Sequence, residues 1–322
     1  MADHVVAKDV FVYTGGRAPQ HVVNAIIDES VEEIDDNAFR DNPNVKSVVC
    51  HDRLLKVGRC AFQGCRSLQR VNMPGVKIIE DGAFYSCKNL KDAEFGDKLE
   101  TVGESAFIGC TSLQRVKLPK VKIIENCAFI RSGVEELEFD EDLETIGSGA
   151  FRGSKLRRIA IPLKDEMFEF NDVHGTYTQF HNCNDLTTVD LVGRIHKTVA
   201  SLHLESWRNE MNEEIQRINQ ILPGTHPDEK GKEIVEWIQS VISRIERYKA
   251  EHGALLKEAT TLLELALWKA QLDYFNVEYV VSVAEKTAKK AKIDVDETRK
   301  EARITSGADI IIKNVLPYLK ME

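Results

Sequence analysis

The sequence contains no uninterrupted apolar run of the roughly 18 residues that a membrane-spanning helix needs. Its first residues lack the basic and apolar regions of a secretory signal. Cys-x-x-Cys pairs, and sets of Cys and His at zinc-ligand spacing, are also missing, although the chain has seven cysteines. These absences predict a cytoplasmic protein, or alternatively a nuclear one, with no membrane partner and with reduced thiols.

Excess positive charge and catalytic motifs are missing as well. The 43 Lys and Arg residues face 52 Asp and Glu residues, and the net charge is −9. Because phosphate backbones bind clustered Lys and Arg, we expect no nucleic-acid partner. The chain has no P-loop, nucleophile elbow, HExxH or paired-carboxylate motif, and His196 and His203 lack a third ligand. We therefore expect no enzyme, cofactor or metal, although residues 195–322 could hold an uncharacterised activity.

What the sequence has is a repeat. The dipeptide Ala-Phe recurs at intervals of 22 or 23 residues, and its phenylalanines are Phe39, Phe62, Phe84, Phe107, Phe129 and Phe151. A fixed short period predicts a solenoid, because no single unit can bury its own apolar face. Stacked units build a long surface that such proteins use to hold other molecules. A binding scaffold is therefore favoured over an enzyme.

Each unit also carries a strand pattern. A β-branched residue stands five positions before each Phe. The pattern L-x-x-V-x-Φ, where Φ is an apolar residue, follows each Phe. With a unit before the first Ala-Phe and one around Phe180, the pattern predicts eight strands in a parallel sheet. The position three residues after the Phe is occupied in some units by Asn or Ser and in the others by a cysteine, namely Cys65, Cys87, Cys110 or Cys183. This interchange favours small polar groups that face buried backbone; a disulfide or a metal between neighbouring cysteines is the alternative.

These motifs resemble the leucine-rich repeat family of the BspA-like type, over about residues 10–192. The segments 13–19 and 307–314 are also similar to diatom-type members of that family. The resemblance implies an α/β solenoid, in which an arc of repeats binds proteins or other macromolecules, and it implies no catalytic residues.

The strand register gives the outward positions, which are the candidate binding site. From the third strand onward, the sign of their charge alternates: Arg70 and Asn72, Asp92 and Glu94, Arg115 and Lys117, Glu136 and Glu138, Arg158, Asp190. Parallel strands lie about 4.8 Å apart, so each row faces opposite charges. Two interpretations are compatible: the rows stabilise stacking, or they recognise a partner of matching charge. The aromatic-rich insertion at 163–177 has two interpretations as well, packing under a loop or binding.

After Gly193 the period becomes helical. We expect one helix at residues 195–222. After a break at 223–227, we expect a second helix, with Asp228 as its N-cap. This second helix carries a heptad seam from Ile234 to Ala266. The seam either packs on the first helix and caps the repeats, with residues 277–283 and 308–319 covering the rest, or pairs with a second chain through residues 230–270. Residues 285–303 predict a solvated helix or linker.

The sequence thus predicts two domains, a leucine-rich repeat arc of about eight parallel strands at 1–194 and an α-helical C-terminal bundle at 195–322, made of a hairpin cap and a terminal helix. The expected function is a non-catalytic scaffold that binds another protein through the concave strand face. The alternative is a structural module that assembles with itself through the heptad helix.

Overall fold

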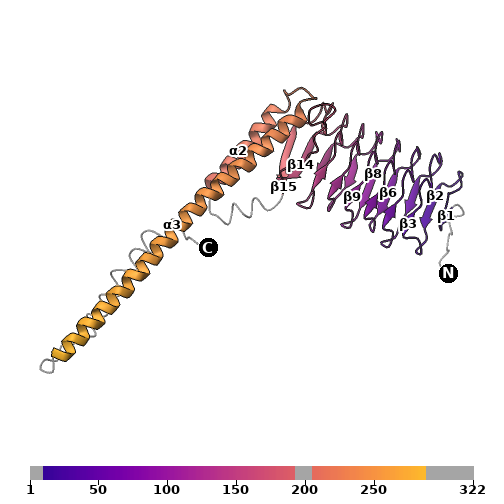
Figure 1. The fold of residues 1–322 in the computed structure, drawn as a ribbon. Coiled ribbons are helices and arrows are strands. Elements are labelled where there is room, and N and C mark those ends of the chain that lie inside the picture. Colours follow the sequence, from indigo (N-terminus) through magenta and orange to yellow (C-terminus); the bar gives the residue numbers. More distant parts are fainter. Residues whose placement is uncertain (1–9, 193–204, 288–322) are drawn as a thin grey trace, which may run out of the picture. The chain divides into compact units, whose positions relative to one another are not determined.

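A computed structural model describes residues 10–192 and 205–287 of the chain (Figure 1). The described residues fall into two compact units. The first unit ends at Ser243, and the second begins at Arg244. The first unit holds the repeats, helix α2 and the first turns of helix α3. The predicted domain boundary at 194/195 lies outside the described residues.

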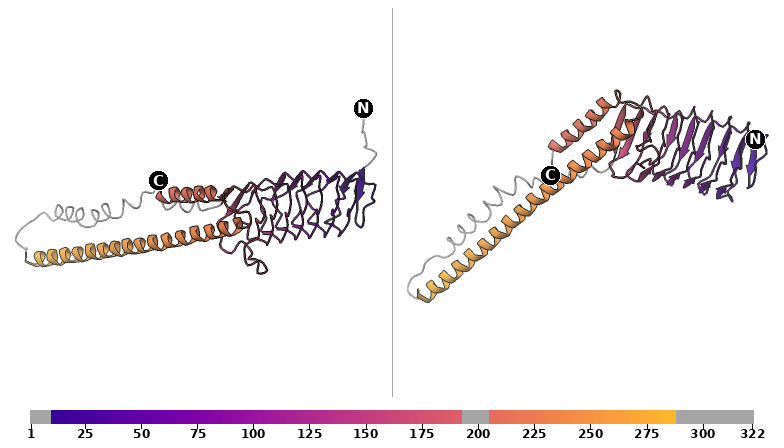
Figure 2. Two further views of the ribbon diagram at one scale, coloured as in Figure 1. Left: turned by 90° about the horizontal axis from the view of Figure 1, so that it is seen from above. Right: turned by 45° about the horizontal axis from the view of Figure 1, so that its top comes forward.

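Two rows of parallel strands run through the repeats (Figures 1 and 2). The first row, which we call the strand face, contains β1 (Val10–Tyr13), β2 (Asn24–Ile27), β4 (Ser47–Val49), β6 (Arg70–Met73), β8 (Asp92–Phe95), β10 (Arg115–Lys117), β12 (Glu136–Glu138), β14 (Arg158–Pro162) and β15 (Thr188–Val192). The eight predicted strands are all present, and β1 adds one more.

The second row consists of two-residue strands, where the sequence predicted only a return segment. Its members are β3 (Glu33–Ile34), β5 (Lys56–Val57), β7 (Ile78–Ile79), β9 (Thr101–Val102), β11 (Ile123–Ile124) and β13 (Thr145–Ile146). The β-branched residue five positions before each Phe is the second residue of each strand, and it is buried. A regular alternation of one exposed or partly exposed residue and one buried residue suffices to form these strands.

A column of phenylalanine rings fills the space between the two rows. The six Ala-Phe rings and Phe180 are fully buried, and successive rings stack with centroids 4.9 to 5.7 Å apart. Tyr13 heads the column at 5.2 Å from Phe39. The backbone stacks too, because the N–H of each of the first five column phenylalanines donates to the Ala carbonyl of the next unit, as from Phe62 to Ala83 at 2.7 Å, and the N–H of Phe151 donates to the Gln179 carbonyl at 2.9 Å. The dipeptide is therefore a packing unit, as its period predicts.

The cysteines at the third position after the Phe hold the stack together. Cys65 Sγ donates to the carbonyl of Phe39 at 2.9 Å, and the other three thiols of this column make the equivalent bond at 2.9 to 3.1 Å. Burial raises the pKa of Cys65 and of Cys110 to about 12. The interpretation of these side chains as donors to buried backbone is confirmed, and all seven cysteines are free thiols.

The last repeat is capped by helices α2 (Glu205–Ile221) and α3 (Lys230–Thr287). Asn219 Oδ1 accepts the backbone N–H of Val189 in β15 at 2.8 Å. Lys230, which is 2% exposed, donates through Nζ to the carbonyls of Cys183, Asn184 and Leu186 at 3.1, 3.1 and 2.6 Å. Burial lowers the pKa of this amine. A lysine thus fills the place of donors that a further repeat would supply.

The helical tail differs from its prediction in two respects. Asp228 does not bond the first turn of α3, because its carboxylate instead lies 2.8 Å from His181 Nε2. Residues 277–283 continue α3 itself and therefore cannot fold back to cover its seam. Residues 195–204, 288–303 and 308–319 lie outside the described residues, and pairing between α2 and α3 stays a prediction. Neither described helix is long and apolar enough to cross a membrane.

Candidate interaction surface

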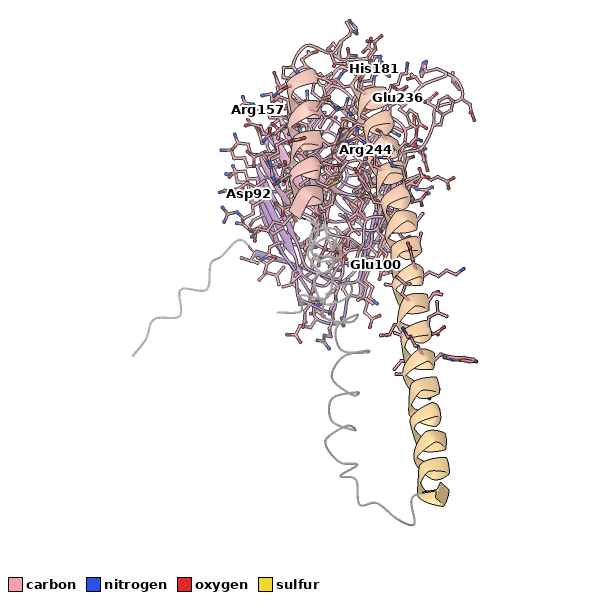
Figure 3. The ribbon with its side chains drawn as sticks, turned by 90° about the vertical axis from the view of Figure 1, so that its left-hand side faces the viewer. Asp92, Glu100, Arg157, His181, Glu236 and Arg244 are labelled. Atoms are coloured by element: carbon pink, nitrogen blue, oxygen red, sulfur yellow. The ribbon has the colours of Figure 1, made fainter. Side chains whose placement is uncertain are left out.

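The outward side chains of the strand face differ between its first and last strands. All ten predicted site residues lie on this face, on β6, β8, β10, β12, β14 and β15. Figure 3 labels Asp92 on this side and Glu100, next to the second row of strands, on the other. We call β1, β2 and β4 the aliphatic half of the face, and β6 to β15 its charged half.

Asp92 is the centre of the charged half. The register aligns it with Arg70 and Arg115, which approach its carboxylate at 3.3 and 2.5 Å. The hydrogen bond from Arg115, with a smaller one from Arg70, holds the pKa of Asp92 below its usual range. The two arginines cover Asp92, whose side chain is only 12% exposed. Asp92 lies at the outward position that the register predicts, with opposite charges on both sides, and the two arginines leave it little exposed.

The other charged rows pair in the same way. Lys117 lies 3.3 Å from Glu94, and Arg158 reaches Glu138 at 3.9 Å and Asp190 at 2.7 Å. The expectation that neighbouring rows pair is therefore met over most of the face. Exposed pairs of this kind contribute at most about 1 kcal/mol each, whereas a shared carboxylate contributes more.

The pairing stops between β10 and β12. These two strands form no ladder, so the strand face divides into a six-stranded and a three-stranded sheet. Within the described residues, no ion pair joins the outward side chains of β10 to those of β12, and Glu136 forms none. Just past the two strands, Lys120 pairs with Asp140 and Asp142 at 2.6 and 3.1 Å. Asn72 is exposed beside the aliphatic half, in register with Val49.

The aliphatic half presents a row of side chains that nothing in the described residues covers. Val12, Ile26 and Val49 are aligned in the parallel register and are 51%, 43% and 57% exposed, and Val10 lies beside them on β1. Ile26 and Val49 lie on the first two strands that the sequence predicts, at the same outward register as Asn72. Val10 and Val12 were missed because β1 precedes the first repeat and lacks its motif; the alternation Val-Phe-Val-Tyr was the available signal.

The insertion at 163–177 has a buried first part and an exposed tip. Met167 and Phe168 are buried, and the Phe168 ring meets Phe180 edge-on at 5.8 Å. Farther along, Asn171 and Thr176 close a small turn, and Val173 and Phe170 are exposed. The packing interpretation therefore holds for the first part of the insertion, while its tip stays available for contacts.

A hollow of about 550 Å³ lies beside this insertion, and its lining residues include types that occur in catalytic sites. Its lining includes Cys127, Ser148, His181 and Asp228. Burial, and to a lesser extent nearby Glu104, raise the pKa of the Cys127 thiol, which disfavours a nucleophile. Ser148 Oγ bonds Thr178 at 2.7 Å and Asn171 at 2.6 Å, and no bond joins it to His181. The residues 10–192 and 205–287 contain no three side chains placed to hold a metal ion.

The fold is that of a stacked-repeat protein, a parallel β-solenoid. The family model for the BspA type leucine rich repeat region matches residues 20–132 and 120–203, with six copies. Since the match extends over more than half of the chain, the chain belongs to the BspA-type leucine-rich repeat family. Membership suggests an interaction or structural role. No curated protein matches the chain.

Crystal structures of bacterial leucine-rich repeat proteins resemble the chain at low identity. TpLRR of T. pallidum is 19% identical with a TM-score of 0.40, over 61% of this chain and 88% of that one. A protein of Eubacterium ventriosum is 21% identical with a TM-score of 0.39, over 52% of this chain and 47% of that one. A protein of Bacteroides ovatus is 22% identical with a TM-score of 0.32, over 57% and 69%.

Proposed function

We propose that the chain is a non-catalytic scaffold that binds another protein through its strand face. The observation that carries this proposal is the exposed row Val12, Ile26 and Val49 on three adjacent strands. Aliphatic side chains gathered on one rigid face favour burial against a partner, since covering the exposed half of each Val or Ile contributes about 0.7–1.5 kcal/mol. The partner that fits is a protein segment with apolar side chains at alternate positions.

The charged half forms the rim of this site. Its ten predicted residues are largely paired with one another, so they give a partner little long-range attraction. They can set specificity where a partner's charges match the alternation. The role of these residues in binding stays a prediction, as does the location of the protein in the cytoplasm or nucleus.

Differential capture tests the proposal. Immobilised wild-type protein is compared with the variant I26E/V49E, and the retained proteins are quantified by mass spectrometry. A matched control is I78E/I123E, because these two isoleucines are exposed to a similar degree in the second row of strands. We expect proteins retained by the wild type and by the control to be lost from I26E/V49E. Equal retention by both variants would refute the strand face as the binding site.

Self-assembly through α3 is the second candidate function. Leu262, Leu265, Leu267 and Trp268 are 48% to 70% exposed, a density of large apolar side chains that favours a partner helix. Sedimentation velocity from about 1 to 100 μM should show an average mass that falls on dilution, and L265E/W268E should be monomeric throughout. A wild-type monomer at every concentration would exclude this function.

A further inference from the structure

One turn of each repeat places a residue in the left-handed region of backbone space. Two positions after the column Phe, φ is positive in every unit, and the occupants are Asp41, Gly64, Ser86, Gly109, Arg131, Gly153 and Asn182. Six of these are Gly or small polar residues, which adopt positive φ most readily. Arg131, with φ of 50°, is the exception. A long side chain held in an unfavourable conformation is a reason to look for a function.

The side chain of Arg131 extends over the next repeat toward a hollow. Its Cγ lies 3.5 Å from the position that a Cβ on Gly153 would take. The hollow has a volume of about 520 Å³ and is lined by Ile130, Arg131, Arg152, Gly153, Asn182 and Asn184. No acidic residue is among the lining residues. Two arginines and two asparagines therefore line one hollow.

These arginines differ from most others on the repeats. Arg59, Arg70, Arg115, Arg157 and Arg158 each pair with a carboxylate. Arg131 and Arg152 are exposed, and neither forms an ion pair with any residue that the structure describes. In a chain of net charge −9, two unpaired arginines in one hollow lack the counter-charge that their neighbours have.

Two other lining residues of this hollow, Asn182 and Asn184, are held by hydrogen bonds to them or to their backbone. Lys230 Nζ donates to the carbonyls of Cys183 and Asn184, which anchors the turn that carries Asn184. Asn182 Nδ2 lies 3.0 Å from His181 Nδ1, so this side chain is held as well. A fixed wall reduces the entropy that a ligand must overcome on binding.

We propose that the Arg131–Arg152 hollow binds an oxyanion, carboxylate or phosphate, on a side chain of a partner protein segment. Guanidinium groups bind both anions through two parallel hydrogen bonds, and the asparagine amides add donors. The hollow is larger than one anionic group, which leaves room for the flanking residues of a peptide. The inference rests on the interaction function proposed above, because it assigns the anion to a protein partner.

Peptide titrations of the full chain, followed by the arginine Nε–H NMR signals, test this site. The probes are a Gly-Gly-phosphoserine-Gly-Gly peptide, the same peptide with glutamate, the same peptide with serine, and sodium phosphate alone. The variant R131G/R152A is compared with R17A/R66A, which removes two exposed arginines elsewhere. Glycine suits φ of 50°, so R131G should keep or raise the melting temperature, whereas a purely structural Arg131 would lower it.

We expect one of the two anionic peptides to bind the wild type and R17A/R66A equally, and R131G/R152A about tenfold more weakly or worse. Tighter binding of the phosphoserine peptide would assign a phosphorylated partner, and tighter binding of the glutamate peptide an acidic one. Any of three results would overturn the proposal: both variants weaken binding equally, the serine peptide binds as tightly as the anionic peptides, or free phosphate binds as tightly as the peptide. Because I26E/V49E leaves this hollow unchanged, its titration separates failure of this site from failure of the strand face.

Discussion

The aliphatic and charged halves of the strand face stand on the same interior but present different surfaces. Beneath both halves, the Phe column and the Ala-Phe backbone ladder continue without interruption. On the outside, Val12, Ile26 and Val49 are exposed, whereas Asp92 and its neighbours form pairs. The charged half therefore uses its outward side chains to stabilise stacking, and the aliphatic half leaves them free for a partner. Substitutions at six positions test this difference.

The largest effect is expected in the shared interior. Phe62 lies beneath the aliphatic half and Phe107 beneath the charged half, and both rings are fully buried. The two variants are Phe62→Ala and Phe107→Ala. Each substitution should lower the free energy of unfolding by about 3–5 kcal/mol, as measured in urea. Similar costs would support one common interior; a cost several-fold larger in one half would show that the interior, too, is divided.

The cap belongs to the charged half alone. Lys230→Met keeps the length of the side chain but removes the three hydrogen bonds to the carbonyls of residues 183, 184 and 186. Two buried acceptors and one partly buried acceptor lose their donor, so we expect a loss of about 2–4 kcal/mol, with faster amide hydrogen exchange in β15 than in β2. The neighbouring exposed Lys232→Met is the control. Unchanged stability of K230M would mean that water replaces the amine without cost.

The ion pairs of the charged half give a smaller effect. Asp92→Asn removes the charge between Arg70 and Arg115 and should cost about 1–2 kcal/mol at pH 7. The folded protein holds the pKa of Asp92 below its usual range, so this carboxylate stabilises the fold at neutral pH. Its contribution is lost as the pH falls through the lowered pKa. The difference between wild type and D92N should therefore disappear in acid, and a difference that persists there would exclude an ionic cause.

Val49→Ser is the matched change in the aliphatic half. Val49 is 57% exposed and makes no polar contact through its side chain, so the free energy of unfolding should change by less than about 0.5 kcal/mol. A loss as large as that of D92N would mean that the aliphatic half also serves stacking. This comparison uses the same urea titration.

One substitution in the cysteine column should stabilise the charged half. Ser132 takes the place of a column cysteine, and its buried Oγ has no hydrogen-bond partner among the described residues. Ser132→Cys should let Sγ reach the carbonyl of Phe107, as Cys110 reaches that of Phe84, and gain about 0.5–1.5 kcal/mol. Ser154→Cys is the control, because Ser154 Oγ already lies 3.5 Å from Cys183 Sγ. A lower melting temperature for S132C would show that the site is too small for sulfur.

The sequence was sufficient for the features that every repeat shares. The Phe column, the strand positions and the hydrogen-bonding function of Cys65 and its equivalents follow from the period, because stacked units must place identical groups in identical surroundings. The second row of strands has the same period but only two residues each. It was missed because so short an alternation carries little signal.

Features that occur only once in the chain could not be predicted from its sequence. The burial of Asp92 depends on how Arg70 and Arg115 lie over it, and neither position nor spacing gives that. A lysine is expected at the surface, so the buried Lys230 could not be foreseen. Residues 277–283 looked like a separate element, although nothing in their composition prevents the continuation of α3.

The most direct test of the division of the strand face is one experiment with two readouts, the melting temperature and the retained partner, for D92N and I26E/V49E. The account predicts opposite results: D92N melts at a lower temperature and, while folded, retains the partner, whereas I26E/V49E melts like the wild type and loses it. Loss of the partner from folded D92N together with its retention by I26E/V49E would contradict the account.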